Sequence, residues 1–413
     1  MMFLLYIDPG TGSMLLSLFI GIATAAIFGL RALIIKLQFI LSGGKIDKNE
    51  SLKNIPFVIF SDHKRYWNVF KPICDEFEKR GVDLVYYTCS SDDPALDSKY
   101  EHIKAECIGE GNKAFAKLNT LHADIFIATT PNLDVYQWKR SKNVKYYVHI
   151  PHTADDLAGY RMFGLDYYDA VLTTGNNQVE LIRKIESLRP AISKKELVTV
   201  GSLTLDGLKK RLDPIPSAAK KEKNEKPIVL LAPSWGVSGI LSRYGAKLLD
   251  ALSKTDFKII VRPHPQTIIS EQNILKPLTE KFPHIEWNYD NDNFDVLNKA
   301  DIIITDFSGI IFDFACVFDK PVIYADTHFD TLPYDADWLD QPQWSFRVLP
   351  EIGIQLKEED FDHIQDLISE VLSSKNLQDG RNKVRSECWE NIDGSAVKAA
   401  DYLIRKQTEI SAK

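Results

Sequence analysis

Cysteine is scarce in this sequence, and the few cysteines lie far apart. The 413-residue chain contains five of them, an odd number, and no two have the spacing of a CxxC motif. Neither a zinc knuckle nor a disulfide framework is indicated, because both need closely spaced or paired cysteines. The simplest interpretation is a protein whose main body lies in a reducing cytoplasm. The cysteines are Cys74, Cys89, Cys107, Cys316 and Cys388.

An excess of positive charge and a short-period repeat are also absent. The chain has 50 basic against 57 acidic residues, which gives a net charge of −7. This balance argues against a dedicated nucleic-acid-binding protein, although it leaves a local basic groove open. Hydrophobic residues make up 45% of the chain and charged residues 26%, which excludes a wholly disordered or fibrous protein. The length favours two folded domains with additional segments.

One long uncharged apolar run lies near the N-terminus. Residues 14–30 contain no charged side chain, and the apolar character continues past Arg31 and Lys36. A helix needs about 20 mainly apolar residues to cross the hydrocarbon core, so this segment is long enough if the two basic side chains extend to the headgroups. The sequence therefore predicts a transmembrane helix as an N-terminal membrane anchor within residues 1–48.

The charges around this run predict its orientation. Asp8 is the only charged side chain before it, whereas Arg31, Lys36, Lys45 and Lys48 follow it. The positive-inside rule then places the large C-terminal part in the cytoplasm, at the plasma membrane or cell inner membrane.

Two other interpretations of the N-terminal run stay open, a cleaved signal peptide and an interfacial helix. Residues 23–25 mimic a cleavage site, but no positive charge precedes the run and the run continues past that site. The preceding residues 6–13 (YIDPGTGS) are interpreted as a Pro/Gly turn that caps the helix, or as a contact site.

Short apolar runs alternate with amphipathic helical segments through the rest of the chain. Helices are expected between the runs, for example at residues 66–80 and 177–187. Unbroken apolar strands that alternate with helices predict doubly wound parallel sheets and thus an α/β fold. The expected strands are residues 55–60, 83–88, 123–129, 145–149, 168–173, 197–200, 227–232, 257–261, 285–289, 301–305 and 321–324.

The strand pattern stops and restarts in the middle of the chain. Residues 213–227 are rich in Pro, Lys and Glu, which predicts a linker between an N-terminal domain (49–213) and a C-terminal domain (227–390). The final segment, 391–413, is expected to contain a helix at 396–406 that packs across the two halves. Two similar halves joined by a hinge imply a cleft between them, where ligand sites commonly form.

Candidate site residues are those that follow a strand, because ligands of parallel sheets bind beyond the carboxyl ends of the strands. The strand at 257–261 is followed by Arg262 and His264, each next to a proline that constrains the backbone. An arginine fork suits phosphate oxygens, and a histidine can donate a proton to a leaving phosphate. The alternative is a rigid loop that contains a histidine by chance.

Two further turns follow strands in the same half. After the strand at 301–305, Ser308 and Gly309 are expected at a helix N-terminus, where amide groups and the dipole attract phosphate. Asp306 either contacts the ligand or caps that helix, and Asp313 is costly in an apolar helix unless it is paired or faces the cleft. The strand at 227–232 is followed by a turn that permits close approach of a ligand and offers a pocket wall. That turn contains Ser234, Trp235 and Gly236.

The first half offers two histidines at one strand end. His149 ends the strand at 145–149, and His152 follows three residues later, before Asp155 and Asp156. A histidine facing the other half would suit a general base, and His149 is preferred because it follows the strand directly. A metal site or a histidine that merely caps a buried strand end are the alternatives, and HxxH on a loop is too unspecific to predict a metal.

These motifs together resemble those of the CDP-glycerol glycerophosphotransferase family. They are the RPHP loop at 262–265, the TDFSGIIFD run at 305–313, the APSWG turn at 232–236 and a strand that ends in histidine. The resemblance spans roughly residues 54–403 and is strongest at 227–326. That family makes teichoic-acid-like polymers and has the GT-B fold, which implies two facing Rossmann-like domains in this chain.

The resemblance also implies residue roles. Arg262, His264, Ser308 and Asp313 would hold or act on the pyrophosphate of the donor, and His149 would be the catalytic base. The chain departs from the family in its first-domain motif, which is HIPHT at residues 149–153 in place of HGTP.

The resemblance predicts a membrane-anchored enzyme of teichoic-acid-type biosynthesis. It would move glycerol phosphate, or a similar polyol phosphate, from CDP-glycerol or a related nucleotide donor to a hydroxyl of a cell-envelope glycan or polymer, and release CMP. The expected partners are that donor, a lipid-linked or polymeric acceptor and the membrane; no cofactor, metal or nucleic acid is expected. Sugar transfer from a nucleotide sugar on the same fold, and a non-catalytic membrane-tethered binding protein, are the alternatives.

Overall fold

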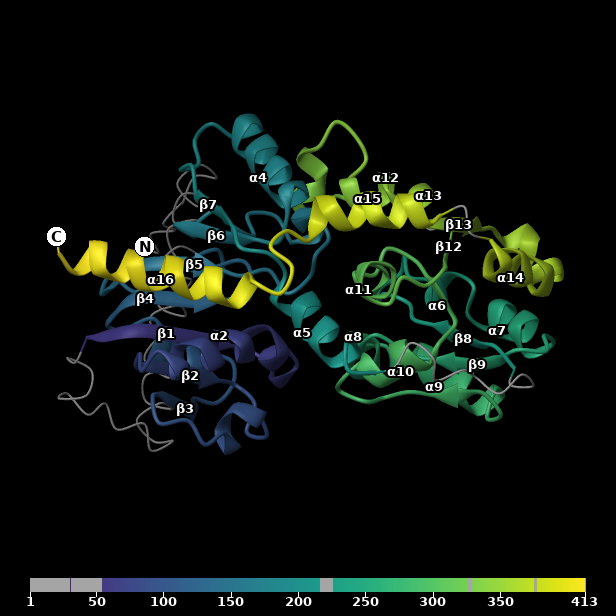
Figure 1. Ribbon diagram of the computed structural model, residues 1–413, viewed down its shortest axis with the longest axis horizontal. Coiled ribbons are helices and arrows are strands. Elements are labelled where there is room, and N and C mark those ends of the chain that lie inside the picture. Colours follow the sequence, from purple (N-terminus) through teal and green to yellow (C-terminus); the bar gives the residue numbers. More distant parts are fainter. Residues whose placement is uncertain (1–29, 31–53, 216–225, 326–328, 375–376, 413) are drawn as a thin grey trace, which may run out of the picture.

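Two parallel β-sheets, one in each half of the chain, organise the molecule (Figure 1). The computed structural model describes residue 30 and residues 54–215, 226–325, 329–374 and 377–412. The first sheet has seven strands in the order β3-β2-β1-β4-β5-β6-β7, and the second has six in the order β10-β9-β8-β11-β12-β13. Both sheets are parallel throughout, so the predicted doubly wound α/β architecture is confirmed.

The first sheet contains every strand that was expected before the linker. Four helices follow its strands: α2 (Trp67–Lys79), α3 (Asn112–Leu118), α4 (Asn176–Leu188) and α5 (Leu203–Leu212). The strands are β1 (Ile55–Ser61), β2 (Leu84–Thr88), β3 (Ile103–Cys107), β4 (Ala123–Ala128), β5 (Val144–His149), β6 (Ala170–Thr173) and β7 (Glu196–Thr199).

The second sheet repeats this plan. Its strands are β8 (Ile228–Leu231), β9 (Lys258–Val261), β10 (Glu286–Trp287), β11 (Ile302–Thr305), β12 (Val322–Ala325) and β13 (Gly353–Leu356). The helices are α6 (Ile240–Arg243), α7 (Gly245–Ser253), α8 (Pro265–Ser270), α9 (Gln272–Lys281), α10 (Phe294–Lys299), α11 (Ile310–Val317), α12 (Trp344–Arg347), α13 (Leu349–Ile352) and α14 (Ile364–Ser373).

Two edge strands, β3 and β13, are absent from the sequence prediction. Each lies at the end of its sheet, and β3 (IKAEC) exposes most of its residues. Edge strands are covered less than central ones, so they lack the continuous apolar run that identifies a buried parallel strand. The sequence signal is therefore strongest for the central strands that carry the candidate site residues.

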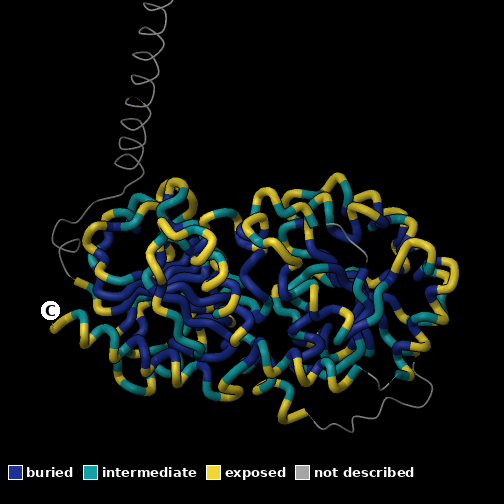
Figure 2. Tube along the Cα trace, turned by 90° about the horizontal axis from the view of Figure 1, so that it is seen from above, coloured by how far each residue is buried: buried dark blue, intermediate teal, exposed yellow. Residues whose placement is uncertain are grey.

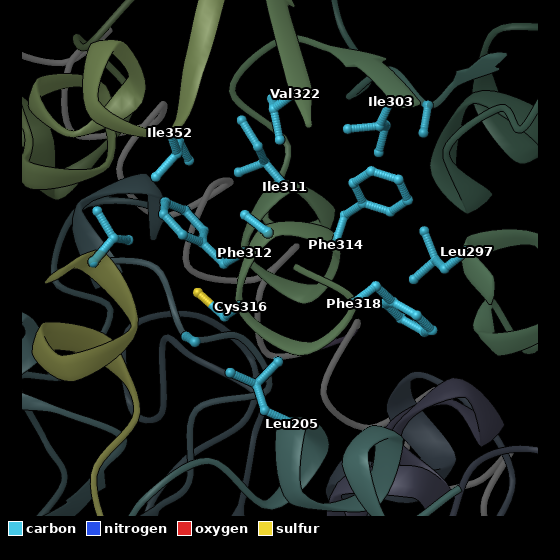
Figure 3. Close-up of a cluster of buried hydrophobic side chains, with 14 of the residues drawn as sticks. Leu205, Leu297, Ile303, Ile311, Phe312, Phe314, Cys316, Phe318, Val322 and Ile352 are labelled. Atoms are coloured by element: carbon cyan, nitrogen blue, oxygen red, sulfur yellow. The ribbon is translucent and has the colours of Figure 1, made fainter. Parts of the chain in front are cut away.

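Each sheet is covered by apolar side chains on both faces, and the buried residues form the centre of each half (Figure 2). Helix α11 lies at the middle of one of these clusters, with Phe312 and Phe314 buried against its neighbours (Figure 3). Leu205 of α5, which belongs to the first half of the chain, joins the same cluster. The two halves therefore share a packed apolar contact between α5 and α11.

The chain returns to the first half at its C-terminus through α15 (Gln378–Cys388) and α16 (Ser395–Ser411) (Figure 1). The helix expected at 396–406 is confirmed as part of α16, but α16 packs on α2, α5 and β4 of the first half. The bridging contacts come from α15, which touches α11, α13 and α4, and from Trp389, whose indole donates to Asp206 Oδ1 at 2.8 Å.

The predicted N-terminal anchor and most of the predicted linker lie outside the described residues. Of residues 1–48 only Leu30 is described, and of 213–227 residues 216–225 are not. Among the helices of the described part, none is long and apolar enough to span a membrane.

Candidate active site

Each sheet has one point where the strand order reverses, between β1 and β4 in the first half and between β8 and β11 in the second. A crevice opens beyond the carboxyl ends of the strands at such a point, and ligands of open α/β sheets bind there. The loops at residues 232–236 and 306–309 flank the reversal in the second sheet. The site residues predicted on these loops therefore lie where the topology favours a ligand.

Arg262 and His264 follow β9, the neighbour of β8. The Nδ1 atom of His264 accepts a hydrogen bond from the Gln266 amide at 3.0 Å, so the neutral ring carries its proton on Nε2. The ring stacks on Trp235 with centroids 6.4 Å apart. Arg262 is 9% exposed and donates through Nη1 to Asn288 Oδ1. A free Nε2–H donor next to a fixed guanidinium suits a phosphate ligand.

Asp306 holds together the two loops at the reversal. Its Oδ1 accepts the Ser234 amide and its Oδ2 accepts the Ile240 amide, both at 2.9 Å. The side chain is 1% exposed, so these contacts favour a positioning role over the direct donor contact that the sequence predicted. Gly236 has a φ of 91°, which favours glycine, and its amide donates to Glu271 Oε1 at 2.9 Å.

The N-terminus of α11 lies directly against the first half. A methyl group added at Gly309 would lie 2.6 Å from Thr153 Oγ1 and 3.3 Å from Asp155 Oδ2. Ser308 precedes it and accepts the Ile311 amide through its carbonyl at 3.1 Å. Only a residue without a Cβ allows this approach, so Gly309 brings the helix end to the loop that carries His152.

Two carboxyl groups from opposite halves lie near this contact. Asp313, in the first turn of α11, accepts a hydrogen bond from Asn293 Nδ2 at 3.2 Å, and burial raises its pKa to about 7. Burial, together with the charges of Asp156 and Asp313, raises the pKa of Asp155 well above its ordinary value. Asp156 connects the halves by accepting the Ser345 amide at 3.2 Å. At neutral pH the Asp155–Asp313 neighbourhood therefore carries less negative charge than its composition indicates.

His149 does not face the second half, which corrects the sequence expectation. Its side chain is 0% exposed, its Nε2 lies 3.0 Å from Tyr160 Oη, and its ring packs edge-on against Tyr160 and Tyr168. Burial lowers its pKa to about 3. The strand end points this ring into the covering layer of the first half, because side chains of a strand alternate between the two faces of its sheet.

His152 takes the position that was expected for His149. It is partly exposed, its Nδ1 lies 3.4 Å from Thr129 Oγ1, and its ring meets the edge of Tyr66 with centroids 5.1 Å apart. Burial and the charge of Arg65 lower its pKa to about 4. His152 is therefore neutral at physiological pH and can accept a proton.

His264 and His152 converge from opposite halves. Burial lowers the pKa of His264 to about 4, with further contributions from the charges of Arg65, His152 and Arg262. Two of these groups belong to the first half and one to the second. This electrostatic effect, together with the approach of Gly309 to Thr153 beside His152, indicates that the facing strand ends of the two halves form one site.

Arg65 and Tyr66 belong to this site and were missed by the sequence prediction. Both lie on the 3-10 turn η1 (Lys64–Tyr66), which follows β1 at the reversal point of the first sheet. Their only sequence signal is their place after the first strand, in a segment without the Pro or Gly pattern of the other loops. Positions after β1 and β4 would have been candidates if the strand order had been known.

The fold and the site define a class of protein: two α/β halves whose parallel strands end at a shared site with neutral histidines, buried arginine and a helix N-terminus. Among the described residues, no three His, Cys, Asp or Glu side chains come together as a metal ion would need. His264 offers a neutral hydrogen-bond donor, His152 a neutral proton acceptor, and the arginines positive charge. This combination suits the binding of a phosphate ester and the transfer of its phosphoryl group.

Part of the chain matches a known family. Residues 191–338 match the model of the family described as CDP-Glycerol:Poly(glycerophosphate) glycerophosphotransferase. Over 98 residues, or 22% of the chain, the sequence is 37% identical to the minor teichoic acid biosynthesis protein GgaB of Bacillus subtilis (strain 168). The match spans 10% of that relative's length. The family resemblance that the motifs indicate is therefore confirmed over this stretch.

Solved structures share the whole arrangement at low sequence identity. The wall teichoic acid polymerase TagF has a TM-score of 0.56 at 15% identity, with 93% of this chain and 98% of that chain covered. A UDP-N-acetylglucosamine 2-epimerase from Listeria monocytogenes, described as putative, has a TM-score of 0.51 at 13% identity, covering 87% of this chain and 97% of that chain. At these identities the likeness shows the fold alone.

Proposed function

We propose that this protein transfers glycerol phosphate, or a similar polyol phosphate, from a CDP-linked donor to a hydroxyl of a cell-envelope polymer, with release of CMP. The observation that carries the proposal is the contact of the N-terminus of α11, at Gly309, with Thr153 on the loop that carries His152, together with the electrostatic effect of His152 on His264. The family match over residues 191–338 supports the nature of the donor.

The second half is proposed to hold the donor. The His264 Nε2–H is available to a phosphate oxygen because Nδ1 is engaged by the Gln266 amide. In the described part of the chain the amides of Gly309 and Ile310 have no hydrogen-bond acceptor, which leaves the start of α11 open to an anion. Arg262, positioned by Asn288, adds positive charge on the neighbouring strand end.

The first half is proposed to supply the base, and the geometry favours His152 over His149. His149 is fully buried and engaged with Tyr160, whereas His152 is partly exposed and coupled to His264. His152 takes the proton of the acceptor hydroxyl as the hydroxyl oxygen forms a bond to the β-phosphorus of the donor. The bond from that phosphorus to the bridging oxygen breaks, and CMP leaves with the electron pair. His264 and α11 stabilise the charge that develops.

The acceptor is proposed to be lipid-linked or polymeric, and the N-terminal segment is proposed to anchor the protein at the membrane with its catalytic body in the cytoplasm. The uncharged run at residues 14–30 and the basic residues after it support this proposal. Fractionation of cells that express the full chain, and a variant without residues 1–48, tests it. Retention in the membrane after alkaline washing is expected for the full chain only.

The donor is tested by incubating the full chain in membranes with CDP-glycerol and, separately, with UDP- and GDP-sugars. CMP release that depends on an acceptor polymer is expected with CDP-glycerol. UDP or GDP release would instead indicate sugar transfer. His264→Ala should abolish CMP release, whereas His284→Ala, at an exposed position where the ring contacts Ser253, should not. CMP release that survives His264→Ala and His152→Ala together would contradict the proposed site.

A further inference from the structure

The turn after β1 presents one arginine in a fixed backbone frame. His63 Nδ1 accepts the Arg65 amide at 3.2 Å, and Ser61 Oγ donates to the His63 carbonyl at 2.9 Å. The neighbouring Lys64 amide donates to Ser90 Oγ at 3.0 Å. The backbone of η1 is thereby held from both sides, so Arg65 projects from a constrained position at the reversal point of the first sheet.

The guanidinium of Arg65 has an unused hydrogen-bond donor. Its Nε is buried and has no hydrogen-bond partner within the described residues. The guanidinium lies over the Tyr66 ring, 5.1 Å from the centroid, and that ring in turn touches His152. A buried donor without an acceptor is costly, which indicates that an acceptor is present when the site is filled.

The positive charge of Arg65 lowers the pKa of a histidine in each half of the molecule. After burial, it is the largest contribution that lowers the pKa of His152 and that of His264. Asp62, the nearest acidic neighbour on the same loop, is largely buried, and burial raises its pKa. The positive charge of Arg65 therefore acts on the histidines of both halves, and positive charge at this point favours an anion.

We propose that Arg65 contacts the diphosphate of the donor from the first half, opposite His264 and α11, and stabilises the charge that forms on the leaving CMP. This inference rests on the proposed function. With this contact, both halves would contribute hydrogen-bond donors to the phosphate site, and neither half alone would place donors on both sides of the diphosphate. Burial first, and Arg65 second, favour the neutral forms of His152 and His264, so that one can accept a proton and the other can donate a hydrogen bond.

The test compares Arg65→Gln and Arg65→Lys with a matched control, Arg405→Gln on the exposed face of α16. Initial rates are measured with CDP-glycerol at varied donor and varied acceptor concentration, and binding of CDP and of cytidine is measured by calorimetry. Arg65→Gln should lower kcat about 10²- to 10³-fold, the effect of removing one donor to a developing anion. It should weaken CDP binding and leave cytidine binding unchanged, with partial recovery in Arg65→Lys.

A pH profile separates a role in the site from a structural one. His152 faces Arg65 and Tyr66 from the β1 turn, Tyr160 from its own half and His264 from the other. Without the positive charge of Arg65, the pKa of His152 should rise, and the acid limb of kcat should move to higher pH. A loss of folding alone would lower the unfolding temperature and leave the limb in place.

The outcomes distinguish this inference from the proposed function. If the wild-type chain binds CDP but releases no CMP from CDP-glycerol, the proposed function fails, and weaker CDP binding by Arg65→Gln still supports the Arg65 contact. If Arg65→Gln leaves both CDP affinity and kcat unchanged, the Arg65 contact is wrong. A rise in the acceptor KM alone, or a wild-type chain that does not bind CDP, also overturns it.

Discussion

The two halves share a fold plan but build their sides of the site differently. In the second half, the site groups lie on short loops that the chain itself constrains, through the prolines around His264 and the two amides held by Asp306. In the first half, the groups that meet them, Arg65 and His152, come from separate strand ends and are placed by packing against Tyr66. The site groups of the second half are positioned by residues close to them in the sequence, whereas those of the first half are positioned by tertiary contacts.

The largest effect is expected where the two sides meet. His152→Gln removes the proposed base and should lower the rate of CMP release about 10²- to 10⁴-fold, because general base catalysis typically contributes that much. His149→Gln should affect stability far more than kcat, since His149 is buried away from the second half. The ratio of kcat losses is measured at equal folded concentration. If His149→Gln lost more activity than His152→Gln at unchanged stability, the assignment of the base would be reversed.

A large effect confined to the second half is expected from Asp306→Ala. The change leaves the buried amides of Ser234 and Ile240 without acceptors and should cost about 2–6 kcal/mol of unfolding free energy, at about 1–3 kcal/mol for each unpaired group. Denaturant unfolding measures this loss. Asp306→Asn keeps one acceptor and should lose less; equal stability of all three proteins would contradict the loop-holding role.

A smaller effect is expected at the contact between the halves. Gly309→Ala places a methyl group 2.6 Å from Thr153 Oγ1, so the halves must separate or the loop must shift. The resulting misplacement of His152 relative to α11 should lower kcat up to about 100-fold with a modest change in stability. Gly207→Ala is the control, because nothing lies within 4 Å of its added methyl group. It should leave kcat unchanged and stabilise α5 by about 0.5–1 kcal/mol.

The effect expected to be smallest at neutral pH is a dependence of stability on pH, to which His149 of the first half contributes. The pKa of His149 is lowered to about 3 from an ordinary 6.5, so the unfolded chain binds a proton that the folded chain does not. Stability should fall as pH drops from about 6.5 toward 3, by up to about 1.4 kcal/mol per pH unit for this group. His149→Phe should reduce that slope relative to wild type, whereas His284→Phe should not. Identical slopes in both variants would contradict the burial of a neutral His149.

The contrast between the halves also explains what the sequence could predict. The central strands carry continuous apolar runs, so their positions, the parallel α/β fold and the loops that follow them could be derived. The RPHP and TDFS loops were found because proline, glycine and the strand ends before them are visible locally. The family resemblance in these loops is confirmed over residues 191–338.

Other features depend on distant contacts. The choice between His149 and His152 depends on which of the two is fully buried. The rings of Tyr160 and Tyr168, which pack on His149, lie 11 and 19 residues after it in the sequence. The sequence around Arg65 does not distinguish it from other basic residues. Its place at the site follows from the strand order, in which β1 lies beside β4, and from the position of the second half. The edge strand β3 lacks an apolar run because most of its residues are exposed.

The central claim is that one donor diphosphate is held between His264 and α11 on one side and the β1 and β5 loops on the other. A crystal structure of the full-length His152→Gln variant soaked with CDP-glycerol tests it most directly. The account predicts the β-phosphate within hydrogen-bonding distance of His264 Nε2 and the start of α11, with Arg65 and position 152 on the opposite side. A diphosphate bound to one half and away from both loops of the other would contradict it.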